Sequence, residues 1–429
     1  MRYDCFVQKW VQKPYYPWVI WGLAVCAFSV DYFARVAPSV MVDSLMRDLK
    51  VQALALGSLS AFFYYPYMAM QVPVGILVDR FSLRWLLTSM VLVCAIGCII
   101  FSLSNQIQVA AFARLIMGFG AAFAFVSALK IAATWFPTRQ FGLLAGLTQA
   151  TGMLGASIGQ MPMAFFVLHI GWRYTLLCIA GIMILLSLLI AFIVRDPSAR
   201  LQSPCLKKNF LHTPWSGLME VLNNKQSWWN ALFAGLLFAP TAAFAELWGV
   251  KFLRETYHLN NEIAAMAISL IFLGWAIGGP IVGWISDRIK RRKIVLLLSA
   301  FFSFILISIV LLIPHFPVTL LFSLLFLYGV ANTGVATSYA LASEINPQAI
   351  SGTSVAFANM ASVLVGAGFQ PIVGWLLEKN WNGVIANGIA VYSATNFRWA
   401  LLVLPASALL ALMIACGIKE TYCQRSEKA

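Results

Sequence analysis

Stretches of about 20 mostly apolar residues recur along the chain, and this repetition constrains the fold more than any other feature. A stretch of this length can cross a bilayer as a single helix. Hydrophobic residues make up 61% of the 429 residues and charged residues only 10%, against about 45–50% and 25% in soluble proteins. We therefore predict an all-α membrane protein of twelve transmembrane helices, at 16–40, 53–77, 85–104, 108–134, 141–167, 173–195, 228–254, 262–285, 294–314, 318–343, 351–378 and 397–418.

The two halves of this pattern repeat one another. A Gly-x3-Asp-Arg motif begins at Gly75 and again at Gly283, 208 residues later, and Gln160 matches Gln370 at a spacing of 210. Two parallel six-helix repeats are typical of secondary transporters. We expect two pseudo-symmetric six-helix bundles and a polar linker between them, over 1–195, 228–429 and 196–227 respectively.

The distribution of positive charge predicts the orientation in the membrane. With the N-terminus placed in the cytoplasm, the predicted cytoplasmic segments hold 19 of the 29 lysines and arginines and the external segments hold 7. Lysine and arginine accumulate in cytoplasmic loops. We therefore expect a bacterial inner-membrane protein with both termini in the cytoplasm, and we attribute the net charge of +14 to topology, not to nucleic-acid binding.

Two short hairpins on the predicted cytoplasmic side carry the repeated motif. A glycine there lets helices approach closely, and an aspartate can accept hydrogen bonds from a helix N-terminus. The arginines either anchor the loops or pair with carboxylates of the opposite half. We predict that the hairpins act as latches between the halves, and simple anchoring is the alternative. The latch residues are Gly75, Asp79, Arg80, Arg84, Gly283, Asp287 and Arg288.

Three segments resemble signatures of the major facilitator superfamily: Gly75–Arg84, Arg114–Gly120 and the glycine-rich stretch 152–162. The resemblance covers essentially the whole chain. It implies the major facilitator fold, a central cavity, alternating access and action as a monomer. It also places Arg114 in the machinery that couples transport to an ion.

The segment Asp31–Pro38 resembles the helix-one pattern of the anion:cation symporter branch of that superfamily, a group that includes bacterial nutrient-uptake systems. In that branch an arginine, here Arg35, grips the negative group of the substrate. Ala34 stands where the branch usually has an aspartate, and Ala121 stands where some members keep a glutamate. The resemblance therefore implies anion binding, with proton coupling moved to other residues or absent.

Ionisable residues inside a span cost about 2.5–3.5 kcal/mol each on insertion scales, so they face a cavity or a partner. Asp31 and Arg35 share a helix face; either they neutralise one another, or substrate competes with Asp31 for Arg35. Glu246 is the first candidate for proton binding, with Asp31 second, and a pair between Glu246 and Lys251 is the alternative. Lys130 is either a second cation of the cavity or a snorkelling residue.

Uncharged polar and aromatic residues complete the predicted substrate site. The same residue types also pack helices against each other, which is the structural alternative. The predicted contacts are Tyr32, Tyr64, Gln149, Trp248, Asn332, Thr337, Asn359 and Gln370.

The sequence carries no phosphate-binding glycine loop and no cysteine or histidine spacing typical of a metal site. We therefore expect no enzyme activity, cofactor or metal. We predict proton-coupled import of a small organic anion of carboxylate type, held by Arg35 and Lys130. The alternatives are an importer of a neutral or zwitterionic nutrient such as an amino acid or nucleoside, a permease for a ferric polycarboxylate chelate, an exporter of drugs or siderophores, and a receptor without transport.

Overall fold

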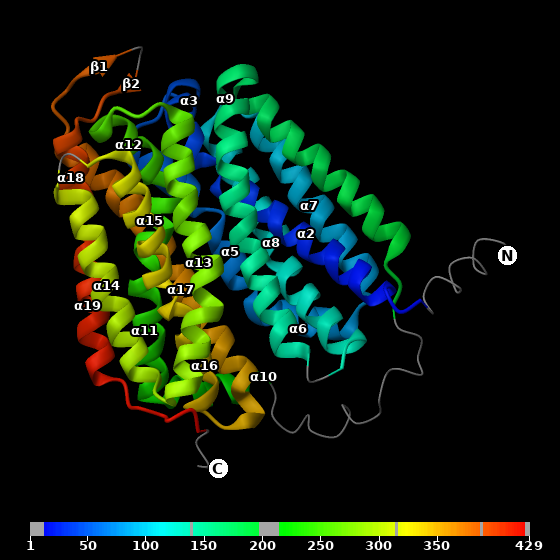
Figure 1. Ribbon diagram of the computed structural model, residues 1–429. Helices are drawn as coiled ribbons and strands as arrows, with labels where there is room; N and C mark the ends of the chain where they lie inside the picture. Colours follow the sequence, from blue (N-terminus) through cyan, green and yellow to red (C-terminus); the bar gives the residue numbers. More distant parts are fainter. Residues whose placement is uncertain (1–12, 138–139, 197–213, 314–315, 387–388, 425–429) are drawn as a thin grey trace.

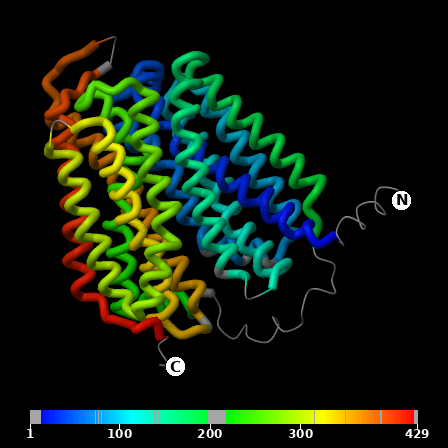
Figure 2. The backbone as a smooth tube through the Cα atoms, viewed as in Figure 1, coloured from blue at the N-terminus to red at the C-terminus, as the bar shows by residue number. Residues whose placement is uncertain are grey.

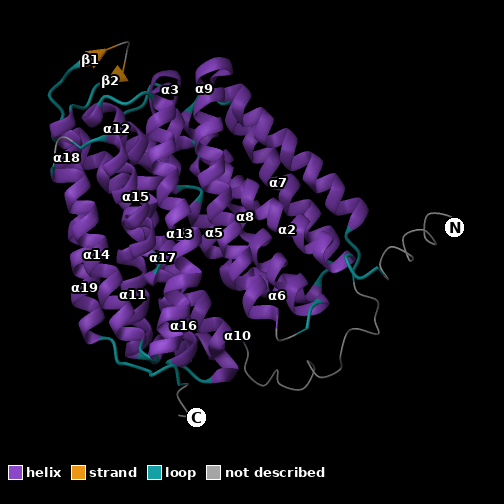
Figure 3. Ribbon diagram, in the orientation of Figure 1, coloured by secondary structure: helices purple, strands orange, loops and turns teal. Residues whose placement is uncertain are grey.

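The computed structural model describes residues 13–137, 140–196, 214–313, 316–386 and 389–424, and nearly all of them are helical (Figure 3). Two groups of helices lie side by side, the first half of the chain in one and the second half in the other (Figure 1). The N-terminal half comprises α2 (Tyr16–Val36), α3 (Pro38–Asp48), α4 (Ala53–Ala61), α5 (Tyr64–Ala69), α6 (Gln71–Arg80), α7 (Leu83–Leu103), α8 (Ile107–Trp135) and α9 (Phe141–Ile193).

The C-terminal half has the same plan with one short strand pair added. It comprises α10 (Pro214–Asn223), α11 (Lys225–Pro240), the π-helix η4 (Thr241–Trp248), α12 (Gly249–Tyr257), α13 (Asn261–Ile289), α14 (Arg292–Leu312), α15 (Val318–Asn332), α16 (Gly334–Glu344), η5 (Gln348–Ile350), α17 (Ser351–Lys379), β1 (Ile385–Ala386), β2 (Ile389–Ala390), α18 (Ala394–Leu401) and α19 (Val403–Gly417). Residues 197–213 of the predicted linker lie outside the described residues, and 214–223 form α10.

Within the described residues, ten helices are long and apolar enough to cross a membrane. Two differences separate this number from the predicted twelve. The 53-residue helix α9 contains Gly171 at a φ of 82°, which divides the run into two crossings. The predicted span at 53–77 consists of the short helices α4, α5 and α6. The structure is therefore consistent with twelve crossings.

Pro38 explains why the first crossing is broken into α2 and α3. Proline has no N–H, so the carbonyl of Ala34, four residues earlier, loses its helical donor. The buried Arg114 of α8 replaces that donor: its Nη1 donates to the Ala34 oxygen at 2.9 Å, and its Nη2 donates to the Ser60 oxygen at 3.1 Å. Arg114 thereby joins α8 to the backbones of α2 and α4.

The two halves are held together at one end of the molecule, which carries α3, α12 and the β1–β2 pair and which we call the hairpin end (Figure 2). There the Lys251 ammonium lies 2.6 Å from Asp43 Oδ1, and the Leu54 N–H donates to Glu378 at 2.8 Å. At the opposite end, which we call the linker end and which carries α6, α10 and α16, a methyl group added to Gly75 or Gly283 would have no atom within 4 Å. The halves therefore meet at the hairpin end and lie apart at the linker end.

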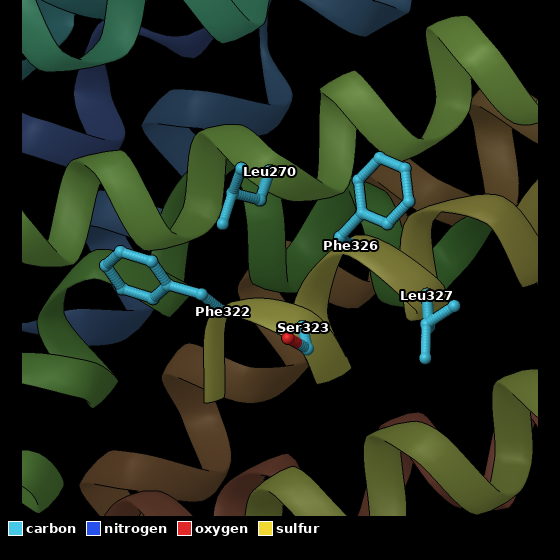
Figure 4. A pocket seen from close by; sticks show the side chains of 5 residues that line it. All are labelled: Leu270, Phe322, Ser323, Phe326 and Leu327. Carbon is cyan, nitrogen blue, oxygen red and sulfur yellow. The ribbon is translucent and has the colours of Figure 1, made fainter. Parts of the chain in front are cut away.

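A groove of about 410 Å³ lies between α13 and α15 (Figure 4). Four of the five residues that line it are apolar, and the Ser323 hydroxyl already donates to the Thr319 oxygen. Because it offers no charged group, this groove does not suit a polar solute, and the chemistry of the molecule lies between the halves.

Candidate functional site

An ion pair between Arg35 of α2 and Glu246 of η4 joins the two halves at mid-height. Arg35 Nη2 lies 3.2 Å from Glu246 Oε1, and Arg35 Nε donates to Glu246 Oε2 at 3.4 Å. The two side chains are 5% and 1% exposed. The Tyr64 hydroxyl of α5 donates to Glu246 Oε2 and accepts from Arg35 Nε at 3.4 Å. Two opposite charges and one hydroxyl thus form a single buried group across the boundary.

Aromatic rings surround the Arg35 guanidinium. Its Cζ lies 4.7 Å from the centre of the Tyr64 ring, 5.0 Å from Tyr32, 5.8 Å from Tyr67 and 5.9 Å from Phe238. Ring faces attract cations by about 0.5–2 kcal/mol each, depending on desolvation. These contacts stabilise the guanidinium at a depth where it would otherwise be costly.

The expected partner of Arg35 on its own helix is not used. Arg35 extends to Glu246 in the other half, so the interpretation in which Asp31 neutralises Arg35 is wrong for this structure. Asp31 is 4% exposed, and in the described part of the chain neither of its carboxylate oxygens has a hydrogen-bond partner. A buried carboxylate without a partner is strongly disfavoured in its charged form.

Lys251 is not the partner of Glu246 either. Its ammonium lies 2.6 Å from Asp43 and 2.7 Å from Glu255. Arg254 Nη1 lies 2.5 Å from Asp43 Oδ2. Lys251 belongs to a cluster of four charges at the hairpin end, which leaves Glu246 to Arg35.

Three further predicted residues lie on the boundary between the halves. Asn359 of α17 donates to Gln71 of α6 at 3.2 Å and accepts from the Tyr339 hydroxyl at 3.0 Å. Gln370 donates to the Tyr64 hydroxyl at 3.4 Å, and Trp248 Nε1 donates to the Gln370 backbone oxygen at 3.0 Å. Polar contacts thus continue from the ion pair toward the linker end.

The remaining predicted contacts lie elsewhere. Asn332 is fully buried and donates to the Tyr328 oxygen, and Thr337 is buried on α16. Gln149 lies partly buried on α9, and Lys130 lies partly buried on α8, five residues before that helix ends. Among the described hydrogen bonds, none joins Gln149, Asn332 or Thr337 to the Arg35–Glu246 pair.

The described contacts of the first hairpin that involve Arg84 lie within one half. Arg84 Nε donates to the Ala191 oxygen at 2.7 Å, and its guanidinium lies 4.6 Å from the Trp85 ring, both within the N-terminal half. Arg80 is exposed, and the side chain of Asp79 lies outside the described residues.

The second hairpin shows the same arrangement. Asp287 pairs with Arg292 at 2.6 Å, and Arg288 lies 5.1 Å from the Trp284 ring. The expected close helix approach is not seen at Gly75 or Gly283 in this conformation, since a methyl group added at either glycine would meet no neighbouring atom within 4 Å.

Sequence reasoning missed two features of the site: the role of Gln160 as a hydrogen-bond donor to η4 and the cluster around Asp43. It also missed the pairing of Arg35 with Glu246, although a signal existed. The repeat spacings of 208 and 210 place the counterpart of residue 35 close to residue 246, which is 211 positions later. The ion pair therefore joins nearly equivalent positions of the two halves, and these positions carry opposite charges.

Two helical bundles that meet at a buried ion pair define a multi-pass membrane protein of the secondary-transporter class. A model of the Major Facilitator Superfamily matches residues 23–371. The chain belongs to this superfamily of transporters, as the sequence motifs predicted.

Relatives in sequence include a protein named for an anion and a protein named as a membrane sensor. The chain is 23% identical over 288 residues to the probable sulfoacetate transporter SauU of Cupriavidus necator, which covers 64% of this chain and 66% of that protein. It is 23% identical over 285 residues to the membrane sensor protein UhpC of Salmonella typhimurium, covering 63% of each. The matched regions thus span slightly less than two thirds of these relatives.

A solved structure shows the same fold. The inward-facing, unoccupied bacterial homolog of the human lysosomal transporter Spinster superposes with a TM-score of 0.80 at 15% identity, covering 97% of this chain and 100% of that one. This likeness confirms the predicted major facilitator fold.

Proposed function

We propose that the chain imports a small organic anion of carboxylate type across the bacterial inner membrane, as a monomer and together with protons. The single observation that carries this proposal is the buried pair of Arg35 and Glu246 across the two halves. Arg35 is the one group of the pair that can bind an acid. An anion entering from either side would compete with Glu246 for it.

Proton coupling follows because a substrate bound to Arg35 would leave the Glu246 carboxylate without its partner. A carboxylate that loses its buried partner is destabilised by several kcal/mol. Glu246 would therefore take up a proton when substrate occupies Arg35. Asp31, buried and without a hydrogen-bond partner in the described part of the chain, is the second proton-binding residue of the proposal.

The charges also limit the substrate. The pair is neutral overall, so binding of one acid group at Arg35 is balanced when Glu246 takes up one proton. Lys130, nearer the linker end of α8, would attract the anion on its way in. Sulfoacetate, which occurs in the name of a relative, carries acid groups that a guanidinium can hold in bidentate fashion.

Alternating access would use the same pair as a link between the halves. The halves are closed at the hairpin end, which the charge distribution predicts to be external. Substrate and proton together would remove the attraction between Arg35 and Glu246 and so permit the halves to rock.

A zwitterionic nutrient is the second candidate, and the opposite charges at equivalent positions favour it. The acid group of such a solute would bind Arg35 while its ammonium group bound Glu246. Transport would then need no proton.

Uptake into liposomes distinguishes these functions. The purified chain would be tested with lactate, sulfoacetate, glucose 6-phosphate and alanine, each with and without an imposed pH gradient. We expect one of the acids to accumulate only with the gradient. Arg35→Gln should lower that uptake at least about tenfold, the effect of losing about 1.4 kcal/mol, whereas Arg47→Gln, an exposed control, should not.

Glu246→Gln provides the test of coupling. We expect this variant to exchange substrate between equal pools but to ignore the pH gradient. Uptake of alanine without pH dependence would favour the zwitterion instead. Acid uptake that survives Arg35→Gln, or no uptake of any probe, would refute the proposal.

A further inference from the structure

The helix that carries Glu246 is widened where that residue lies. The segment η4 is a π-helix, entirely buried, that begins directly after Pro240. At its end the Gly249 N–H bonds the Phe244 oxygen, five residues back, in place of the Ala245 oxygen four residues back. Short π-helical turns are rare and frequently occur at functional sites. Because such a turn gives up the regular bonds between residues four apart, side-chain donors from outside can serve as partners of its carbonyl groups.

Two glutamines supply those partners, one from each half. Gln160 Nε2 of α9 donates to the Ala245 oxygen at 3.2 Å, directly before Glu246. Gln370 Nε2 of α17 donates to the Ala242 oxygen at 2.9 Å, one turn earlier. Both glutamines are fully buried. Their sequence positions are 210 residues apart, so they are equivalent residues of the two repeats.

The orientation of both amides is fixed by chemistry. A backbone oxygen only accepts hydrogen bonds, so the NH₂ group of each glutamine must face it. The two Oε1 atoms are left without a hydrogen-bond partner within the described residues. An unpaired buried acceptor costs about 1–3 kcal/mol, so the bonds to η4 outweigh that cost in both places.

Each amide also reaches a group that belongs to the site or to the helix break beside it. Gln370 Nε2 donates to the Tyr64 hydroxyl, which bonds Glu246. Gln160 Nε2 donates to Ser39 Oγ at 3.2 Å, next to the Pro38 break. The glutamines therefore connect the widened turn to α3 and α5 of the N-terminal half.

We propose that Gln160 and Gln370 are positioning residues that hold the π-helical turn so that the Glu246 carboxylate faces Arg35. They act through η4 and do not touch the carboxylate themselves. This inference deepens the proposed function and rests on it for the proton role of Glu246. The orientation of the Glu246 side chain toward Arg35 can be tested separately. Gln160 bonds η4 across the boundary between the halves, so this contact belongs to the conformation closed at the hairpin end.

A double-mutant cycle tests the positioning on the full chain in detergent. Gln160→Met and Gln370→Met keep the length of the side chain and remove the amide donor. If the glutamines aim Glu246, the change in thermal midpoint caused by Glu246→Gln should shrink by at least half in either background, because the pair with Arg35 is already lost. The exposed control Gln108→Met, at the start of α8, should leave that change intact. Fully additive effects in both backgrounds would refute the proposal. Should a methionine variant fail to fold, Gln160→Asn and Gln370→Asn, which keep the amide but are too short, take its place.

Infrared titration in liposomes measures the pH at which Glu246 takes up a proton. A purely structural role of the glutamines would leave this pH unchanged. The carboxyl band that disappears in Glu246→Gln reports protonation of that residue. In the two glutamine variants we expect its midpoint to shift to higher pH by about one unit, a tenfold change in proton affinity, since the misaimed carboxylate loses Arg35. An unchanged midpoint in both folded variants would contradict the inference. If no carboxyl band of Glu246 is found, the proton role of Glu246 in the proposed function is overturned. The double-mutant cycle alone then tests whether the glutamines position Glu246.

Discussion

Tyr64 is the residue whose hydroxyl contacts both members of the ion pair, while its ring lies against the guanidinium at 4.7 Å. These two roles can be separated, because phenylalanine keeps the ring and removes the hydroxyl. Hydrogen bonds to charged groups contribute about 1.5–3 kcal/mol.

We expect Tyr64→Phe to lower the rate of coupled uptake about tenfold, the lower bound of that range. The protein should remain folded, since the ring still packs on Arg35. Uptake by liposomes of equal protein content measures the effect, and Tyr65→Phe, at a partly exposed neighbour, is the control. Equal rates for both variants would show that the hydroxyl is not part of the site.

Arg114, for which the sequence motif predicts a coupling role, also has a structural task. It donates to the backbone oxygens of Ala34 and Ser60, and no carboxylate is among its described hydrogen-bond partners. The need arises from Pro38, which withholds an N–H from Ala34.

Arg114→Met should therefore destabilise the protein by about 2 kcal/mol, the cost of leaving buried carbonyl groups without donors. Adding Pro38→Ala to that variant restores an N–H four residues after Ala34 and should recover about half of the loss. Thermal unfolding in detergent measures both changes. If Pro38→Ala gives no recovery in the Arg114→Met background, the account of the helix break is wrong.

Among the elements, run length and composition predicted where the helices lie but not where they break. Long apolar runs such as those of α7 and α14 appear in the structure within two residues of the predicted bounds. The π-helical turn at 241–248 is bonded by side chains from other helices, which a local pattern cannot contain. The ion pair shows the same limit. Helical spacing predicted Asp31 as the partner of Arg35, but the observed partner is Glu246, 211 residues away.

Gly57 is a small residue that permits the close approach of α4 and α17. A methyl group on Gly57 would lie 2.5 Å from the Gln370 oxygen and 2.9 Å from Pro371 Cα, both in backbone. Backbone cannot yield as a flexible side chain can, so an added methyl group must push the two helices apart.

We expect Gly57→Ala to cost about 1–3 kcal/mol of stability, the usual effect of overpacking. Gly181→Ala is the matched control, because a methyl group there has no atom within 4 Å. That variant should be neutral or gain up to about 1 kcal/mol from helix propensity. Thermal midpoints in detergent compare the pair, and equal midpoints would contradict the packing argument.

For the whole molecule, the charge cluster at the hairpin end holds the closed state together. Asp43 of α3 receives Lys251 at 2.6 Å and Arg254 at 2.5 Å, both from α12 in the other half. Asp48, five residues later, pairs with Arg173 at 2.9 Å within its own half. The same substitution, aspartate to asparagine, can therefore be made at Asp43, which contacts the other half, and at Asp48, whose partner Arg173 lies in its own half.

Asp43→Asn should open the hairpin end, since the asparagine leaves two cations of α12 without their carboxylate. Hydrogen–deuterium exchange of the protein in liposomes would show faster exchange in α3 and α12. Asp48→Asn should leave α12 unchanged. Equal exchange of α12 in both variants would mean that the cluster does not hold the halves together.

The same cluster predicts how closure responds to acid. Burial opposes ionisation of Asp43, but Lys251 and Arg254 outweigh it and lower the pKa of this carboxyl below its ordinary value of 3.8. A lowered pKa means that the carboxylate stabilises the closed end at neutral pH, and that this contribution is lost only as the pH falls through the lowered value. Exchange in α12, corrected for the intrinsic rate, should therefore stay constant from about pH 7 to about pH 5. If the hairpin end opens between these pH values, a group other than Asp43 must be responsible. If that opening is lost in the Glu246→Gln variant, the responsible group is the central ion pair of Arg35 and Glu246.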